Sequence, residues 1–545
     1  MRALFLSLAP ALSTASAMAA SEDDLRAALM QRFKGDRSGA CIAAAVIENG
    51  TTARAYFCAN AKSERSIDER TAFEIGSITK TMTAALLAEI IGRGEIAIDD
   101  PLAKLLPPGT NVPSFNGTHI TVGNIVTHTS GLPSFPWRIT DMSNPYARLT
   151  EADLLDTLAK TQLKRAPGSQ REYSNFALMV LSYALAKRSG RDFETLLHER
   201  LLSPLGMDDT FIVTRPSAVR VAEGHFSNSR PTGPWDVRVD LAGAGGVRAT
   251  LPDMVRYLEG QLGMRDSSIT PVLAQTQEQI AGVGSQATSM AWEILSTENG
   301  RTFVMHPGGT GGFSSFFAFD RAAKRGVVLL SDTALTDVGG LRRLAMHLLD
   351  PSLPAGTPRN MATAEVKLID ALVGQYRLPI GLSMELRRQG NKLTIQADGD
   401  PEFEMEYDSA GEFYPFEFDA ILQPRRKVDG TYTFTWYQLG GIHQAERVGA
   451  TVPVAVRPAP AEAQLKEYEG NYSFSRTLGL RVYALGPKIM VQGTGQAPLE
   501  AVPFNKDIFV TEPIGAEVAF ERDAGGKVIA LTLNTRGQVL RGERH

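Results

Sequence analysis

The stretch Phe73-Glu74-Ile75-Gly76-Ser77-Ile78-Thr79-Lys80 is the part of this 545-residue sequence from which the fold can be argued. An apolar pattern with helical spacing follows it to Ile91 and stops at Gly92, as expected of a helix that ends at a glycine. Ser77 and Lys80 are three residues apart, so on a helix their side chains share one face. The pattern therefore places a hydroxyl beside an amine where a helix begins.

An amine beside a serine hydroxyl can make that hydroxyl a nucleophile. Serine is a poor nucleophile until a base takes its proton, and a lysine can do this where its surroundings lower its pKa toward neutrality. The positive field of a helix N-terminus also favours a developing oxyanion. Ser-x-x-Lys alone is a weak signal, because it also describes a serine that caps a helix beside a solvated lysine.

A second candidate segment is Arg171-Glu172-Tyr173-Ser174-Asn175-Phe176, which precedes another helical pattern. A phenol at Tyr173 can relay protons between Ser77, Lys80 and a leaving group. The amide of Asn175 can hydrogen-bond both the lysine and a substrate. The alternative is a tyrosine packed under the helix and an asparagine that caps it.

A third segment, Val304-Met305-His306-Pro307-Gly308-Gly309-Thr310-Gly311-Gly312-Phe313-Ser314-Ser315, is rich in glycine between two strand-like runs. Glycine lets a backbone approach a ligand closely. We predict that the N–H groups of Gly309 and Ser77 form an oxyanion hole, and that His306 and Gly308 also bind substrate. A simple glycine-rich turn between strands is the alternative.

Together the three segments resemble the motifs of the penicillin-recognising serine hydrolases, which include class C β-lactamases, DD-peptidases, D-aminopeptidases and related esterases. The resemblance covers about residues 25–347 and implies an α/β (α+β) sandwich, in which an antiparallel sheet and a helical lobe enclose the cleft. The other segments that match are Thr127-His128-Thr129-Ser130-Gly131-Leu132-Pro133, Pro204-Leu205-Gly206-Met207 and Ala244-Gly245-Gly246.

The resemblance also implies a role for each residue. Ser77 would be the acylated nucleophile and Lys80 its general base. Tyr173 would help move a proton to the leaving group and later activate the deacylating water. Asn175 would orient Lys80 and the substrate amide, and His306 with the following strand would bind substrate and complete the oxyanion hole.

One position departs from the β-lactamase pattern. The family's Lys-Thr-Gly, whose lysine holds the carboxylate of the drug, is replaced here by His306-Pro307-Gly308. A histidine of ordinary pKa is mostly neutral at pH 7 and is a weaker anchor for an anion. Efficient β-lactam hydrolysis is therefore not expected, and the His-x-Gly version is more similar to the D-aminopeptidase and peptidase branch.

We therefore expect a serine peptidase or amidase that forms an acyl-enzyme on small or D-amino-acid-containing peptides. A carboxylesterase or weak β-lactamase would use the same machinery. A non-catalytic penicillin-binding or cell-wall sensor would acylate and then stall, but the presence of every catalytic residue counts against it. A triad built on His128 and Ser130 is disfavoured because that turn recurs in the family away from the nucleophile, and an α/β-hydrolase because no Gly-x-Ser-x-Gly elbow appears.

The composition limits the kinds of molecule that the protein is expected to bind. The chain has 56 Lys and Arg against 60 Asp and Glu with no basic stripe, so nucleic acid is not an expected partner. No apolar run is long enough to span a membrane. The eight histidines show no metal-ligand spacing, so we expect no metal and no cofactor. A small-molecule or peptide substrate remains, and the oligomeric state stays open.

The N-terminus resembles an export signal. Residues 1–19 contain Arg2, an apolar stretch from Ala3 to Leu12 and the small-x-small run Ala17-Met18-Ala19, as in a cleaved signal peptide. We therefore expect the mature protein in the periplasm or outside the cell.

Two cysteines frame a predicted hairpin whose turn is Asn49-Gly50, a type I′ signal. If Glu48 pairs with Thr51, counting outward places Cys41 opposite Cys58 in a non-hydrogen-bonded pair, with Cα atoms about 4.5 Å apart. That is the short edge of disulfide geometry, and export favours the bond over two unbonded cysteines.

The chain divides into four parts by its patterning. After the signal peptide we expect a hydrolase domain over 22–350, a Pro-rich linker, and β-domains over 361–450 and 461–545 separated by a break from Pro453 to Pro460. The two tail segments look like copies at a constant offset of 96 residues. We expect both to be small barrels, because closure removes exposed strand edges. D-aminopeptidases are built in the same way. The matched positions include Gly374/Gly470, Tyr376/Tyr472, Leu386/Val482, Gly390/Gly486 and Lys392/Lys488.

Overall fold

The computed structural model describes residues 21–545 except for 61–64, 137–143, 281–288, 297–300, 398, 428–429, 439–440, 449–461, 475–477, 495, 497, 506, 512–515, 524 and 536–537. The predicted signal peptide and the predicted break from Pro453 to Pro460 lie outside the described residues. None of the helices in the described part of the chain is long and apolar enough to cross a bilayer.

The N-terminal part is built on a six-stranded antiparallel sheet. Its strand β1 lies between β13 and β2, and its side chains alternate between two apolar cores: Ala43 and Ala45 face one, Ile42 and Ala44 the other. An interior strand buried on both faces needs a continuous apolar run, which explains the sequence here. In sheet order the strands are β10 (Glu293–Ser296), β11 (Thr302–Gly309), β12 (Ser314–Asp320), β13 (Arg325–Ser331), β1 (Cys41–Glu48) and β2 (Thr51–Cys58).

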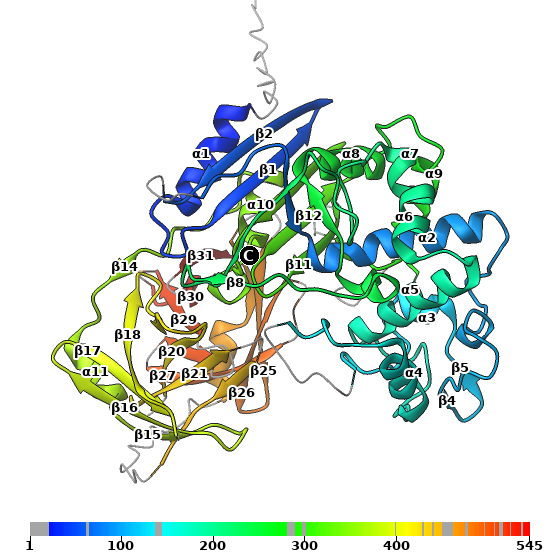
Figure 1. The fold of residues 1–545 in the computed structure, drawn as a ribbon. Helices are drawn as coiled ribbons and strands as arrows, with labels where there is room; N and C mark the ends of the chain where they lie inside the picture. Colours follow the sequence, from blue (N-terminus) through cyan, green and yellow to red (C-terminus); the bar gives the residue numbers. More distant parts are fainter. Residues whose placement is uncertain are drawn as a thin grey trace, which may run out of the picture.

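Helices cover both faces of this sheet (Figure 1). Helices α1 (Glu22–Phe33) and α10 (Arg342–Leu349) pack on one face. The other face carries α2 (Thr79–Gly92), α5 (Asn175–Ser189) and α8 (Leu251–Gln261). The helical lobe is completed by α3 (Val122–Val126), α4 (Glu151–Lys160), α6 (Phe193–Leu197), α7 (Ser203–Leu205) and α9 (Thr270–Thr276).

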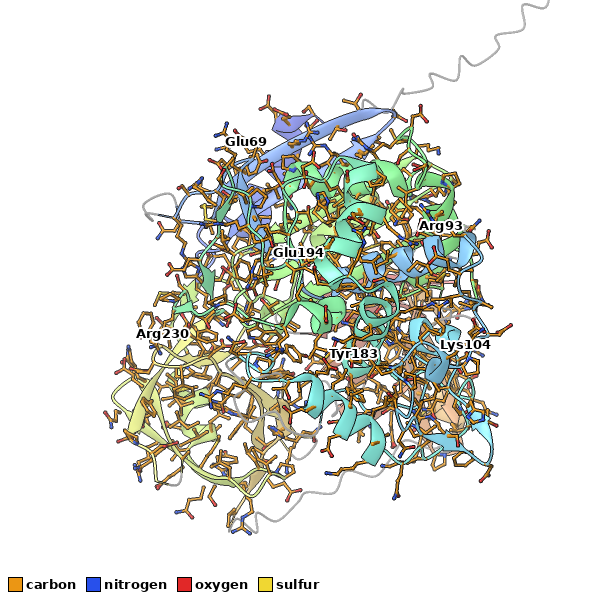
Figure 2. The ribbon with its side chains drawn as sticks, turned by 45° about the vertical axis from the view of Figure 1, so that its right-hand side comes forward. Glu69, Arg93, Lys104, Tyr183, Glu194 and Arg230 are labelled. Atoms are coloured by element: carbon orange, nitrogen blue, oxygen red, sulfur yellow. A yellow bond between two sulfur atoms is a disulfide. The ribbon has the colours of Figure 1, made fainter. Side chains whose placement is uncertain are left out.

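The helical lobe lies away from the first C-terminal sheet. Arg93 and Lys104, at its outer edge, are on the opposite side of the molecule from that sheet (Figure 2). Short strands join the lobe to the central sheet: β3 (Thr71–Glu74) pairs with β6 (Arg220–Val221) and β9 (Arg248–Thr250). Strand β3 leads through the turn at Gly76–Ile78 directly into α2, so the segment that contains Ser77 connects this small sheet to the helical lobe.

The β1–β2 hairpin has the register that its turn predicts. Glu48 pairs with Thr51 and Cys41 with Cys58, and the two cysteines form a disulfide with Cα atoms 3.9 Å apart, closer than the sequence argument expected. The backbone N–H of Cys41 also donates to the carboxylate of Asp332, at 2.8 Å.

The C-terminal part forms two all-β units. In the first, β22 and β23 stand at opposite ends of the strand order but only Ala445 separates them in sequence, so the sheet curls into a nearly closed barrel. Its helix is α11 (Val366–Leu372), and its strands are β14 (Met361–Ala362), β15 (Gly374–Arg377), β16 (Ser383–Gln389), β17 (Lys392–Ala397), β18 (Glu402–Asp408), β19 (Phe413–Pro415), β20 (Ile421–Arg426), β21 (Tyr432–Gln438), β22 (Gly441–Gln444) and β23 (Glu446–Arg447).

The second unit is a closed barrel of eight strands preceded by the short helix α12 (Glu462–Leu465). The expected fold class, an α/β sandwich followed by two all-β units, is confirmed. The barrel strands are β24 (Gly470–Ser473), β25 (Gly479–Leu485), β26 (Lys488–Gly493), β27 (Leu499–Asn505), β28 (Ile508–Thr511), β29 (Ala516–Arg522), β30 (Val528–Thr535) and β31 (Gln538–Arg544).

Candidate active site

Ser77 lies in a tight turn that opens α2. The chain leaves β3, forms the 3₁₀ turn η1 (Gly76–Ile78) and continues directly into the helix. Gly76 has φ of +50°, and a Cβ there would lie 2.5 Å from the backbone nitrogen of Gly309 and 2.7 Å from its oxygen. Only glycine permits this approach, so the turn that carries the serine touches the backbone of β11.

Lys80 is fully buried one turn along the helix. Its Nζ lies 2.8 Å from Ser77 Oγ and donates to the carbonyl of Ala244 at 2.6 Å. Burial lowers the pKa of Lys80 well below its usual value, because the charged ammonium loses its hydration. A neutral amine in this position can accept the serine proton.

Tyr173 reaches the same place from the loop before α5. Lys80 Nζ lies 4.8 Å from the centre of its ring, and its hydroxyl is hydrogen-bonded to Ser77. Burial raises the pKa of Tyr173 well above its usual value, although the bond with Ser77 opposes the shift. The phenol therefore keeps its proton at neutral pH and can donate it.

Asn175 and its neighbours form the wall of a small cavity beside the nucleophile. The family resemblance implies that Asn175 orients Lys80. In the structure, the side chain of Asn175 is hydrogen-bonded to Tyr146, and the amine of Lys80 contacts the carbonyl of Ala244. The cavity holds about 50 Å³ and is lined by Ser77, Tyr146, Asn175, Met179, Trp235, Val237, Leu241, Ala244, Gly245, Gly246, Gly309 and Thr310.

The glycine segment lies along β11 at the edge of this cavity. Gly309 lines it, but Gly308 does not: a Cβ on Gly308 would collide with the carbonyl of Ile75 and the hydroxyl of Ser315. Gly308 therefore permits close packing of β11 against the chain that leads to Ser77. The structure places it in the wall of another cavity.

His306 is buried and close to the tyrosine. Its ring centre is 6.3 Å from that of Tyr173, and Nδ1 lies 2.6 Å from the carbonyl of Pro307. Burial lowers the pKa of His306 to about 3, because the charged imidazolium would lose its hydration. The imidazole is therefore neutral at pH 7 and supplies no fixed positive charge.

His128 and Ser130 lie in the turn that the sequence interpreted as structural. Nδ1 of His128 accepts the backbone N–H of Ser174 at 3.2 Å, and Ser130 Oγ accepts that of Leu132, also at 3.2 Å. The ring of His128 lies 4.5 Å from that of Tyr173. Both side chains thus accept hydrogen bonds from the backbone, and the imidazole of His128 packs against the ring of Tyr173.

Sequence reasoning missed part of the cavity wall. Tyr146 and Trp235 come from loops without a recognisable motif and pack edge to face, with ring centres 5.7 Å apart. Ala244 belongs to Ala244-Gly245-Gly246, one of the segments that resemble the sequences of the family. In the described part of the chain, no group of three or more His, Cys, Asp or Glu residues could hold a metal ion.

The N-terminal part of the chain is similar in sequence to known proteins. Residues 26–350 match the family model named Beta-lactamase. D-alanyl-D-alanine-carboxypeptidase/endopeptidase AmpH of Escherichia coli (strain K12) is 33% identical over 261 residues, a match that spans 45% of this chain and 66% of that relative. A protein named Beta-lactamase from the same strain is 27% identical over 302 residues, 49% of this chain and 77% of that one.

A solved structure shares the fold of the N-terminal part. The crystal structure of D-alanine carboxypeptidase AmpC from Burkholderia cenocepacia superposes with a TM-score of 0.50 and 24% sequence identity. The superposition covers 60% of this chain and 99% of that one.

Proposed function

Because this chain belongs to the Beta-lactamase family, we propose that it is an exported serine hydrolase that acts through an acyl-enzyme on small peptides, including those with D-amino acids. The proposal rests above all on one contact. Lys80 Nζ, buried and with its pKa lowered, lies 2.8 Å from Ser77 Oγ. This is the arrangement of an activated nucleophile and its base.

The proposed reaction begins with attack of Ser77 Oγ on the scissile carbonyl while Lys80 takes its proton. The tetrahedral oxyanion is stabilised by the backbone N–H groups of Ser77 and Gly309, which are brought together where Gly76 approaches the backbone of Gly309. The protonated phenol of Tyr173 gives a proton to the leaving amine. Tyr173, now a phenolate, then takes a proton from the water that attacks the acyl carbonyl, and Lys80 returns its proton to Ser77 Oγ as the acyl group leaves.

The proposed preference for peptides follows from the absence of a positive charge on His306. A neutral imidazole cannot replace the fixed ammonium that holds the carboxylate of a β-lactam, and burial keeps His306 neutral with a pKa of about 3. The relative named carboxypeptidase/endopeptidase is the more similar of the two described above. Both observations favour peptide substrates over β-lactams.

Export is proposed on two grounds. The first 19 residues have the composition of a signal peptide. The disulfide between Cys41 and Cys58 is of a kind that persists in oxidising compartments such as the periplasm.

A substrate panel tests the proposal. Purified protein is assayed with D- and L-aminoacyl p-nitroanilides, short p-nitrophenyl esters and nitrocefin, with Ser77→Ala as the control for background hydrolysis. We expect turnover of at least one amide, slow or no turnover of nitrocefin, and none by the variant. Turnover of esters with every amide inert would refute the peptidase assignment, and lasting labelling by a fluorescent penicillin without turnover would support a sensor instead.

A further inference from the structure

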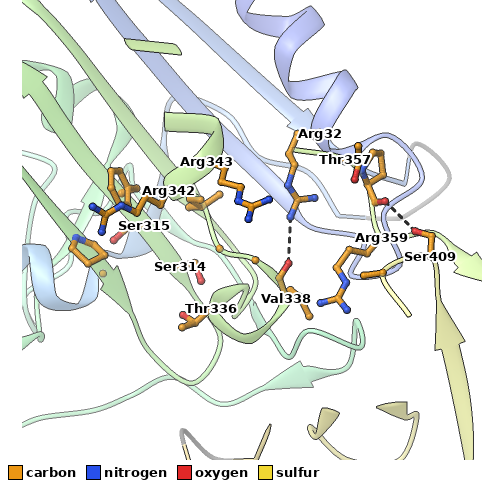
Figure 3. A pocket seen from close by; sticks show the side chains of 18 residues that line it. Arg32, Ser314, Ser315, Thr336, Val338, Arg342, Arg343, Thr357, Arg359 and Ser409 are labelled. Carbon is orange, nitrogen blue, oxygen red and sulfur yellow. Dashed lines mark hydrogen bonds between the residues drawn. The ribbon is translucent and has the colours of Figure 1, made fainter. Parts of the chain in front are cut away.

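A second cavity lies on the face of the central sheet that carries α1 and α10 (Figure 3). It holds about 350 Å³, within the size range of small-molecule sites. Its wall comes from β11 and β12, from the start of α10, from the linker at 357–359 and from Ser409 and Ala410 after β18. The catalytic part and the first C-terminal unit therefore build it together.

The charged side chains of the lining are all arginines. It includes no aspartate or glutamate, but it has four arginines: Arg32, Arg342, Arg343 and Arg359. Their acidic partners lie outside the lining: Asp36 pairs with Arg32 at 2.9 Å, Asp408 with Arg359 at 2.8 Å and Glu293 with Arg342 at 3.9 Å. Arg32, Arg343 and Arg359 point toward the same space (Figure 3). Guanidinium groups rather than carboxylates therefore face the cavity.

Helix α10 begins at this cavity in an unusual way. Its N-cap is Leu341, which offers no side-chain cap, and its first turn has no acidic residue but starts with Arg342 and Arg343. By contrast, α1 and α4 have capping boxes and acidic first turns. The N-terminus of a helix carries partial positive charge, so Arg342 and Arg343 add like charge at a place that favours an anion. A local rule broken in this way points to a functional site.

Arg359 adds an independent observation. The residue is 6% exposed, and its Nε has no hydrogen-bond partner among the described residues, although Nη2 pairs with Asp408 and Glu412. A buried donor left without an acceptor is costly. An oxygen of a bound ligand would satisfy it.

We propose that this cavity binds an oxyanion, the phosphate or carboxylate group of a small ligand. The planar forks of arginine fit such groups with paired hydrogen bonds, and the partial positive charge at the start of α10 favours an anion there. Pro307 and Gly308 also line the cavity, so the ligand would contact the strand that carries His306 and Gly309.

Binding of inorganic phosphate and of citrate to the full chain tests the proposal, by calorimetry and by the shift in Tm, in a chloride buffer of constant ionic strength. The variant Arg342→Gln/Arg343→Gln removes two cations from the cavity. Arg54→Gln/Lys104→Gln removes two exposed cations elsewhere and is the matched control (Lys104 is labelled in Figure 2). We expect saturable binding at one site, about tenfold or more weaker in the cavity variant and unchanged in the control.

The two anions distinguish the sources of the oxyanion: tighter binding of phosphate assigns a phosphate group, and tighter binding of citrate a carboxylate. Absence of saturable binding for both anions at millimolar concentration, or binding that survives in the cavity variant, would overturn the proposal. None of these outcomes depends on hydrolysis, so they are separate from the test of the active site.

Discussion

At the scale of single residues, burial decides the chemistry of this site. An exposed lysine is charged at pH 7 and an exposed histidine becomes charged slightly below it, but burial lowers the pKa of both Lys80 and His306. The same burial holds the proton on Tyr173. One desolvated space thus holds the proposed base, the proposed proton donor and an uncharged imidazole.

The first residue-scale prediction concerns Lys80. Its amine must be neutral to accept the proton of Ser77, so kcat/KM should fall as the pH drops through its lowered pKa. Lys80→Ala should reduce kcat by about 10²–10⁴, the range for loss of a general base, and should remove this acid limb. The pH dependence of kcat/KM for the wild type and for Lys80→Ala measures this limb. Activity of Lys80→Ala near that of the wild type would refute the role of Lys80 as general base.

The second concerns acid stability at His306. Its pKa is about 3 when folded but near 6.5 in the unfolded chain. Between these values the unfolded chain binds a proton that the folded one does not, so stability falls as the pH is lowered from 6.5 to 3.

His306→Gln should therefore flatten the loss of unfolding free energy over this window, by at most about 1.4 kcal/mol per pH unit. Chemical denaturation at several pH values measures the slope. The control is His119→Gln, at the exposed end of the hairpin β4 (Ser114–Phe115) to β5 (Thr118–His119). Equal slopes for wild type and His306→Gln would contradict the argument.

At the scale of elements, the close approach of η1 and β11 creates the site. A Cβ on Gly76 would meet the backbone of Gly309, which cannot move aside as a flexible side chain can. Gly94, just after α2, also has a positive φ (+74°), but a Cβ there would meet nothing within 4 Å. The two glycines therefore separate backbone strain from steric contact.

We predict that Gly76→Ala lowers kcat/KM by about 10²-fold or more, since displacement of one oxyanion donor has an effect of this size. Gly94→Ala should cost only about 1 kcal/mol of stability, from the left-handed backbone, with kcat/KM unchanged. Kinetics and thermal unfolding of both variants check this, and equal kinetic effects would show that the contact with Gly309 is unimportant.

The tail units repeat as elements as well as in sequence. Strands β15, β16 and β17 begin 96 residues before β24, β25 and β26. Tyr376 donates its hydroxyl proton to the carbonyl of Leu372 at 2.8 Å, and Tyr472, its counterpart, donates to that of Tyr468 at 2.7 Å. Matched tyrosines thus connect each first strand to the helical turn before it.

At the scale of the whole molecule, the first C-terminal unit is fastened to the catalytic part by buried polar contacts. Asn228, 4% exposed, donates to the carbonyls of Pro415, Phe416 and Phe418 at 3.0–3.3 Å. Arg37 pairs with Asp408 at 2.9 Å. Ile421 and Tyr437 also join the apolar core beneath α1 and α10. The unit is therefore part of one packed body.

Asn228→Ala should destabilise this junction by about 1–3 kcal/mol, because three carbonyls lose their donor. Asn111→Ala removes a single exposed bond to the carbonyl of Ala159 within the catalytic part and should change stability by no more than about 0.5 kcal/mol. Denaturant unfolding and limited proteolysis of the 351–360 linker measure the difference. Equal stability of the two variants would count against the junction.

Local sequence by itself determined the features with short spacing. The turn Asn49-Gly50 set the register that faces Cys41 with Cys58, and the spacing of Ser77 and Lys80 placed them on one turn. Repeat positions 96 residues apart predicted two similar β-units. In each case the determining interactions lie within a hairpin, a helix turn or a recurring strand pattern, which the order of side chains encodes directly.

Only the tertiary structure decided what surrounds those residues. Lys80 is held by the carbonyl of Ala244, 164 residues away, and Asn175 pairs with Tyr146. The arginine-lined cavity joins residues of α1, α10 and the 357–359 linker. Such contacts and the pKa shifts that burial causes depend on how distant segments pack together, and neither spacing nor periodicity along the chain specifies that packing.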